Sequence, residues 1–158
     1  ANKLVLMALM FVGGSPGSTA GGIKTVTLTV LVMIVFATLR RRPQVEVFHR
    51  RLSPAVAGRA ITVTVLLTAI MFIATLVLYI TERHSGWSLV DILFEAVAAI
   101  STAGFSTGVT ATLTTAGKVV IILLMLIGRL GPLTLLALIT FNIKPGVYEY
   151  PNEPLIVG

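Results

Sequence analysis

The chain has no cysteine and few charged residues. Asp, Glu, Lys and Arg make up only 11% of its 158 residues, and there are two histidines and one tryptophan. The absence of cysteine excludes a disulfide framework, thiol catalysis and a cysteine-based metal site. Soluble domains carry about 25% charged residues. The low charge therefore argues against a soluble globular protein.

Hydrophobic residues dominate what is present. They account for 56% of the chain, and the mean hydropathy is +0.98. This composition predicts an all-α membrane protein. The chain begins with Ala1, Asn2 and Lys3 inside an apolar run, without a basic leader or a small-residue cleavage site. We therefore expect it to start within a longer polypeptide.

The basic residues are concentrated in one segment. Lys and Arg outnumber Asp and Glu by 12 to 6. Most of the arginines lie in residues 40–59, namely Arg40, Arg41, Arg42, Arg50, Arg51 and Arg59. Because cytoplasmic loops of membrane proteins are rich in Lys and Arg, this segment is predicted to be a cytoplasmic linker. Aromatic residues are not spaced for base stacking, so we expect no nucleic-acid partner.

The apolar runs come in two lengths. A helix needs about 20 residues to cross a hydrocarbon layer of about 30 Å. Residues 4–12 and 88–100 are too short and predict re-entrant half-helices, the second with Ser88 as N-cap and Asp91 in its first turn. Three longer runs predict membrane spans, at residues 23–39, 60–81 and 118–143, the last interrupted at residues 128–132.

The tetrapeptide Ser-Thr-Ala-Gly occurs twice, each time between a short and a long apolar run. The copies are Ser18, Thr19, Ala20 and Gly21, and Ser101, Thr102, Ala103 and Gly104. At this offset of 83 residues the flanking helices are expected to superpose. The pattern predicts tandem helix–pore loop–helix repeats. The resulting divisions are residues 1–39, the linker 40–59, a complete repeat at 60–143 and a tail at 144–158.

Such an arrangement suits cation binding. The C-terminus of a half-helix carries about half a negative charge, and a following loop of small residues can turn its carbonyl oxygens toward an ion. Gly21 and Gly104 would give the backbone conformations that other residues avoid, and the Ser and Thr hydroxyls of both copies would add ligands. The alternative is that these glycines make small-x-x-x-small helix contacts, Gly17 with Gly21 and Gly104 with Gly108.

Four segments together resemble the Trk/Ktr/HKT superfamily of potassium transporters and, within it, the KtrB-type translocating subunits. They are residues 13–25 (GGSPGSTAGGIKT), 101–108 (STAGFSTG), 128–132 (GRLGP) and 150–154 (YPNEP). The resemblance implies potassium uptake through a pore of four consecutive repeats, each with a filter glycine. This chain corresponds to the end of the third repeat and all of the fourth, with Gly21 and Gly104 as filter glycines.

The resemblance also implies partners. The first two repeats of the same polypeptide would complete the pore, the polypeptide would form a homodimer, and a cytoplasmic nucleotide-binding ring would regulate it. The protein would lie in the cell membrane as a multi-pass protein, with the filter loops toward the outside and the linker 40–59 in the cytoplasm. Potassium is then the transported ion, and we expect no enzymatic activity.

Arg129 is the one charge deep within a predicted span. A charge there costs at least about 2.5 kcal/mol, so the side chain should face water or a partner. The resemblance places it beneath the filter as a barrier to cations, and a structural ion pair is the alternative. The resemblance also implies a gate segment near residues 29–36, but this stretch has no glycine or proline to break a helix.

Three further readings are open. Gly13, Ser15 and Gly17 match a nucleophile-elbow pattern, which would suggest an intramembrane serine protease, although His49 and His84 fall in loops on opposite sides. A structural membrane subunit without an ion path is a second alternative. Glu95 on the second half-helix is either an external attractor of cations or a helix-packing residue.

Overall fold

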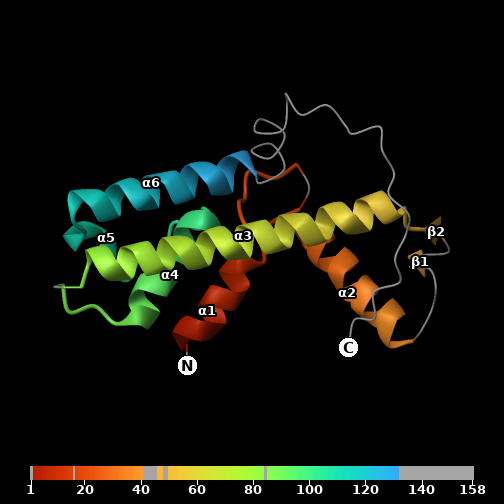
Figure 1. Cartoon of the computed structure of the whole chain (residues 1–158), viewed down its shortest axis with the longest axis horizontal. Helices are drawn as coiled ribbons and strands as arrows, with labels where there is room; N and C mark the ends of the chain where they lie inside the picture. The colour runs from red at the N-terminus through yellow and green to blue at the C-terminus, as the bar shows by residue number, and fades with distance from the viewer. Residues whose placement is uncertain (1, 16, 41–45, 48–49, 84, 132–158) are drawn as a thin grey trace, which may run out of the picture.

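The computed structural model describes residues 2–15, 17–40, 46–47, 50–83 and 85–131, and in this part the chain is almost entirely helical (Figure 1). The elements in chain order are α1 (Asn2–Phe11), α2 (Thr25–Leu39), β1 (Glu46–Val47), β2 (Arg50–Arg51), α3 (Pro54–Thr81), α4 (Leu89–Ile100), α5 (Val109–Thr112) and α6 (Thr115–Leu130).

Helix α3 forms the long axis of the molecule. Its 28 residues extend about 42 Å at about 1.5 Å per residue. Ser53 caps it by accepting a hydrogen bond from the Val56 amide at 3.4 Å, and Pro54 occupies the first turn. Within the described residues, α3 is the one helix long and apolar enough to cross a membrane. This confirms a long apolar helix over residues 60–81, although it begins six residues earlier.

The other two predicted spans are shorter where the structure describes them. Helix α2 has 15 residues and α6 has 16, below the length of about 20 that a full span requires. Helix α6 ends at Leu130 because Gly131 adopts φ 78°, which takes the backbone out of the helical region. Residues 132–143 and the tail 144–158 lie outside the described residues.

Helix α4 lies at the centre of the core. It packs against α1, α3, α5 and α6, and all its residues from Phe94 to Ile100 are buried. Figure 1 shows α4 crossing α3, with α6 above α3 in the view and α1 below it. The predicted cap is confirmed, since Ser88 accepts a hydrogen bond from the Val90 amide at 3.2 Å. Asp91 in the first turn pairs with Lys3 of α1 at 2.5 Å.

Three short elements were not expected from the sequence. Helix α5 (Val109–Thr112) precedes α6, and strands β1 and β2 pair antiparallel in the basic linker. The linker therefore departs from a purely helical fold by two strands of two residues each.

The two Ser-Thr-Ala-Gly copies do not occupy equivalent places, so the expected superposition of their flanking helices is wrong. Helix α4 ends at Ile100, directly before Ser101, whereas α1 ends at Phe11, well before Ser18. Four small residues do not determine where a preceding helix stops. The break between α1 and α2 falls at residues 12–24, and residues 29–36 belong to the regular helix α2.

Candidate functional site

The segment between α1 and α2 is a loop with a closed stem, which we call the stem loop (residues 12–24). Val12 and Ile23 form a parallel bridge. The Gly13 amide donates to the Ile23 carbonyl at 2.8 Å, the Ile23 amide donates to the Phe11 carbonyl at 3.2 Å, and the Thr25 amide donates to the Gly14 carbonyl at 3.2 Å. The end of α1 therefore lies beside the start of α2, and the first Ser-Thr-Ala-Gly copy projects from this stem.

The two Ser-Thr-Ala-Gly copies contact each other. The Gly21 amide donates a hydrogen bond to the Thr102 hydroxyl oxygen at 3.0 Å. Thr102 has φ 52°, the left-handed region that non-glycine residues rarely adopt, and within the described residues it is the one non-glycine with positive φ. Strain of this kind occurs at sites where the surrounding structure over-determines the backbone. The contact joins the stem loop to the loop after α4, residues 101–108, which we call the filter loop after the role that the sequence resemblance implies for it.

Gly21 and Gly104 are glycines for different reasons. Gly104 has φ 77°, and a Cβ there would have no heavy atom within 4 Å. Gly21 has no positive φ, but a Cβ there would lie 2.6 Å from the Ile100 carbonyl oxygen and 3.0 Å from that of Gly128. The expectation that both glycines supply unusual backbone conformations is therefore confirmed at Gly104 and wrong at Gly21. Close packing requires the glycine at position 21.

The hydroxyls of the two copies are largely engaged within the protein. The Ser101 hydroxyl is buried and donates to the Val97 carbonyl at 2.6 Å. The Ser18 hydroxyl oxygen accepts a hydrogen bond from the Ala20 amide at 3.0 Å. Ala103 and Gly104 are exposed, so the free surface of the filter loop begins after Thr102. The potassium-binding role of both copies stays a prediction.

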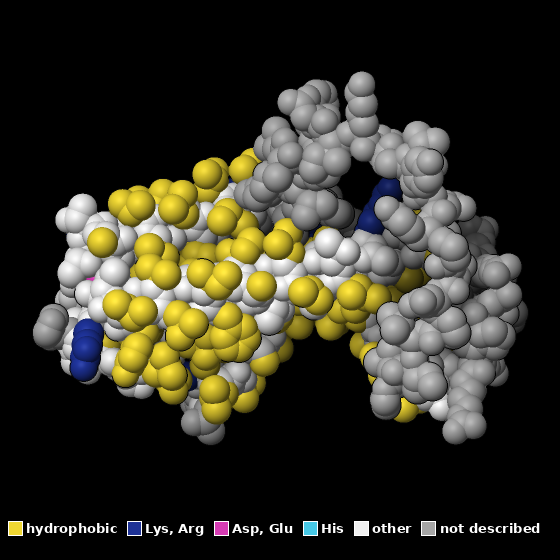
Figure 2. Space-filling view, in the orientation of Figure 1, with side chains coloured by type: hydrophobic (Ala, Val, Ile, Leu, Met, Phe, Trp, Pro, Cys, Tyr) yellow, Lys and Arg dark blue, Asp and Glu magenta, His cyan; other side chains and the backbone are white. Residues whose placement is uncertain are grey.

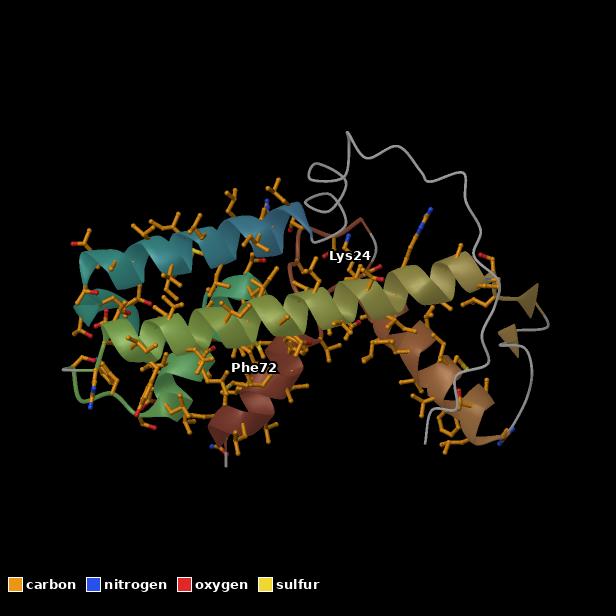
Figure 3. The ribbon with its side chains drawn as sticks, in the orientation of Figure 1. Lys24 and Phe72 are labelled. Carbon is orange, nitrogen blue, oxygen red and sulfur yellow. The ribbon has the colours of Figure 1, made fainter. Side chains whose placement is uncertain are left out.

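Two basic side chains border one cavity beneath the loops. Arg129 and Lys24 line a cavity of about 300 Å³ together with Ser18, Thr19, Gly128 and Gly131. Arg129 donates from Nη1 to the Thr19 carbonyl at 3.4 Å. Figure 3 labels Lys24, where the stem loop meets α2. Arg129 makes no ion pair with any other residue the structure describes, so the described contacts do not support the structural ion pair. Sequence reasoning had singled out Arg129 but not Lys24.

Glycine also sets the distance between α6 and α4. A Cβ on Gly128 would lie 2.0 Å from the Ile100 carbonyl oxygen, which is too close for any side chain. Gly128 therefore allows α6 to approach the C-terminal end of α4, where the filter loop begins. This contact keeps Arg129, the next residue, beside both loops. From the sequence, residues 128–132 were predicted to interrupt the span, and this close packing of Gly128 was not expected.

Glu95 is buried behind the filter loop. Its side chain is 4% exposed and accepts hydrogen bonds from the Ser106 hydroxyl at 2.7 Å, from the Thr107 amide at 3.3 Å and from the Thr110 hydroxyl. A buried, saturated carboxylate is not an external attractor of cations, so the packing alternative fits better. The contacts join residues 11 to 15 positions apart, and no sequence periodicity marks such pairs.

The residues on which the alternative chemistries depend lie partly outside the described part of the chain. Among residues 2–15, 17–40, 46–47, 50–83 and 85–131, no group of His, Cys, Asp and Glu side chains is placed to hold a metal ion. Both histidines on which the protease alternative depended, His49 and His84, lie outside the described residues. Ser15 is exposed in the stem loop, and its carbonyl accepts a hydrogen bond from the Ser18 amide.

The fold and the two joined loops define an apolar helical protein with small-residue loops at its centre. The model of the TrkH family, described as cation transport proteins, matches residues 1–146. The chain belongs to this family.

Several curated relatives match nearly the whole chain. The Ktr system potassium uptake protein D of Bacillus subtilis is 43% identical over 97% of this chain and 33% of its own length. The potassium/sodium uptake protein NtpJ of Enterococcus hirae is 37% identical over 100% of this chain and 36% of its own length. The Ktr system potassium uptake protein B of Vibrio alginolyticus is 34% identical over 98% and 33% respectively. The chain therefore spans about a third of the length of these relatives.

Proposed function

We propose that the chain forms part of a potassium-conducting pore and contributes to potassium uptake across the cell membrane. It would supply the end of the third helix–pore loop–helix repeat and all of the fourth. The observation that carries the proposal is the position of the filter loop. Helix α4 ends at Ile100 and the exposed, non-helical residues Ala103 and Gly104 follow within four positions. The partial negative charge of the helix end and the loop carbonyls favour a cation there.

The two Ser-Thr-Ala-Gly copies would have different roles along one ion path. Ser101, Thr102, Ala103 and Gly104 would form the filter strand of the fourth repeat. Ser18, Thr19, Ala20 and Gly21 would line the path on the inner side of that strand, where the Gly21 amide meets Thr102. The stem loop would also provide the interruption of a long helix that the family resemblance implies, in place of residues 29–36. Its tight packing at Gly21 is the observation that favours a structural contribution at this copy.

Arg129 would act as the barrier to cations, and Lys24 would add to it. Both side chains border the same cavity, and neither forms an ion pair with another described residue. A positive charge near the path raises the energy of a passing cation. The Arg129 contact with the Thr19 carbonyl supports a position at the inner end of the loops.

The rest of the pore would come from the remaining repeats of the same polypeptide. Large hydrophobic side chains are exposed along all the long helices, including Leu9, Val35, Phe36, Phe72, Ile80 and Ile122. Figure 2 shows this apolar surface continuing over α3 and α6. Such a surface suits lipid, the remaining repeats and a homodimer contact. The basic linker 40–59 would face the cytoplasm and a nucleotide-binding regulatory ring.

A substitution at Gly104 tests the proposal. In the full-length transporter that contains this chain, Gly104→Ser should lower potassium uptake relative to sodium uptake. A side chain at φ 77° costs about 1–2 kcal/mol and shifts the neighbouring carbonyls. Uptake of rubidium, as a tracer for potassium, and uptake of sodium would be measured in cells that lack other potassium uptake systems. Each rate would be divided by the amount of the transporter in the membrane.

Gly86→Ser is the matched control. Gly86 has φ 74°, and a Cβ there would also have no atom within 4 Å, but it lies in the connection between α3 and α4. It should cost similar stability and leave the ratio of the two uptake rates unchanged. An unchanged ratio in Gly104→Ser, at normal membrane amounts, would contradict the assignment of the filter loop.

A further inference from the structure

We infer that Glu95 is a positioning residue for ion selection, whose carboxylate fixes the outer half of the filter loop. The inference rests on the proposed function of that loop. Glu95 does not touch the ion in this arrangement. It acts through Ser106, Thr107 and Thr110, which follow Gly104 and continue into α5.

The contacts of Glu95 are concentrated on a single segment. Both carboxylate oxygens are used, since Oε1 accepts from the Ser106 and Thr110 hydroxyls and Oε2 accepts from the Thr107 amide. The Ser106 hydroxyl oxygen in turn accepts from the Gly108 amide at 3.0 Å. One buried group therefore holds residues 106–110 against α4. Hydrogen bonds to an ionised acceptor are roughly twice as strong as neutral ones, which suits a group that must fix a loop.

Glu95 and the filter loop border the same cavity. This cavity has a volume of about 480 Å³, and Thr102, Gly104, Phe105 and Arg129 also line it. Arg129 borders this cavity as well but is not within ion-pairing distance of Glu95. The loop donors are therefore the described partners that balance this buried carboxylate.

The carboxylate has a structural counterpart elsewhere in the fold. Glu82 is also 4% exposed, and its Oε1 accepts from the Thr114 amide at 2.9 Å and from the Thr114 hydroxyl at 2.6 Å. It joins the end of α3 to the start of α6 and makes no contact with the filter loop. Both residues are buried carboxylates that bind one amide and at least one hydroxyl, and only Glu95 holds the proposed filter.

The first test compares Glu95→Gln with Glu82→Gln in the full-length transporter. Glutamine keeps the size of the side chain but has one acceptor oxygen instead of two, so it cannot accept from the Thr107 amide and from both the Ser106 and Thr110 hydroxyls at once. Glu95→Gln should lower the ratio of rubidium to sodium uptake by about tenfold, the effect of about 1.4 kcal/mol. In Glu82→Gln the remaining oxygen can still accept from both the Thr114 amide and the Thr114 hydroxyl, so this variant should leave the ratio unchanged.

A second variant covers the case in which Glu95→Gln does not reach the membrane. Thr110→Val removes one donor and keeps the volume of the side chain, and it should lower the ratio in the same direction. The double variant of Glu95→Gln and Thr110→Val should lower the ratio by less than the product of the two single effects, because both act on one contact. If Glu95→Gln does not reach the membrane, an unchanged ratio of rubidium to sodium uptake in Thr110→Val would overturn the inference.

The outcomes distinguish this inference from the proposed function. An unchanged ratio in Glu95→Gln, together with a lowered ratio in Gly104→Ser, overturns only the role of Glu95. An unchanged ratio in both overturns the filter assignment and this inference with it. An equal loss of selectivity in Glu95→Gln and Glu82→Gln also overturns the inference, because it would assign the effect to general loosening of the fold.

Discussion

At the scale of single residues, the structure separates two uses of glycine. At Gly104 there is space for a Cβ, but the positive φ disfavours residues with a side chain. At Gly21 φ is not positive, but a Cβ would clash with neighbouring backbone atoms. Both glycines end the same tetrapeptide, so the sequence suggested one shared reason. A substitution therefore has different physical consequences at the two positions.

We predict that Gly21→Ala lowers the amount of folded protein. The new Cβ would lie 2.6 Å from the Ile100 carbonyl oxygen, a backbone atom at the end of α4. Overpacking of this kind costs about 1–3 kcal/mol. Membrane abundance and the midpoint of thermal unfolding in detergent would measure the effect.

Gly58→Ala is the control for this prediction. Gly58 lies in α3 with nothing near its Cβ position, and alanine there should stabilise the helix by up to about 1 kcal/mol. If Gly21→Ala were as abundant and as thermally stable as Gly58→Ala, the packing account of Gly21 would fail.

At the scale of elements, the sequence predicted the helices well and their junctions poorly. The apolar lengths located α1, α2 and α4 to within two residues and the C-terminal end of α3 at Thr81, because hydrophobic runs and caps such as Ser88 are local signals. The junctions depend on contacts between distant residues. The Glu82 contact with Thr114 spans 32 positions, and the Gly21 contact with Thr102 spans 81. No local pattern encodes such pairs, so the inequality of the two Ser-Thr-Ala-Gly copies was not predictable.

The junction of α3 with α6 gives a prediction at this scale. Glu82→Ala removes the acceptor for the Thr114 amide and hydroxyl at the N-terminus of α6. Loss of such a capping group costs about 0.5–2 kcal/mol. Hydrogen exchange should become faster in the first turn of α6, around Thr115 to Lys118. Thr114→Ser keeps the hydroxyl and the amide and should exchange like the unaltered protein, and equal exchange in both variants would exclude a capping role for Glu82.

At the scale of the whole molecule, two loops that are far apart in the sequence meet beside α4 and α6. The stem loop follows the first helix and the filter loop follows the fourth, yet Thr102, Gly21 and Gly128 bring them together. Arg129 is adjacent to this junction and touches the stem loop through Thr19. A change at Arg129 therefore bears on the proposed ion path as a whole.

We predict that Arg129→Ala raises ion flux and preserves selectivity. Two unit charges about 4 Å apart interact by about 4 kcal/mol at an effective dielectric constant near 20, before water and counterions screen them. Removing this repulsion should speed permeation, while the filter carbonyls stay in place. Lys24→Ala should act in the same direction, since Lys24 borders the same cavity. Flux per molecule would be measured in liposomes, and an inactive, poorly expressed protein would instead assign Arg129 a structural role.

The closed stem between α1 and α2 fixes the two helix ends next to each other. Three backbone hydrogen bonds hold Phe11, Gly13 and Gly14 against Ile23 and Thr25. These hydrogen bonds offset the conformational entropy that is lost when the loop closes. This entropic cost grows only slowly with the number of residues in the loop. Compact loops with adjoining ends are often functional units in their own right. The stem therefore holds the two helix ends together whatever the length of the segment that it encloses.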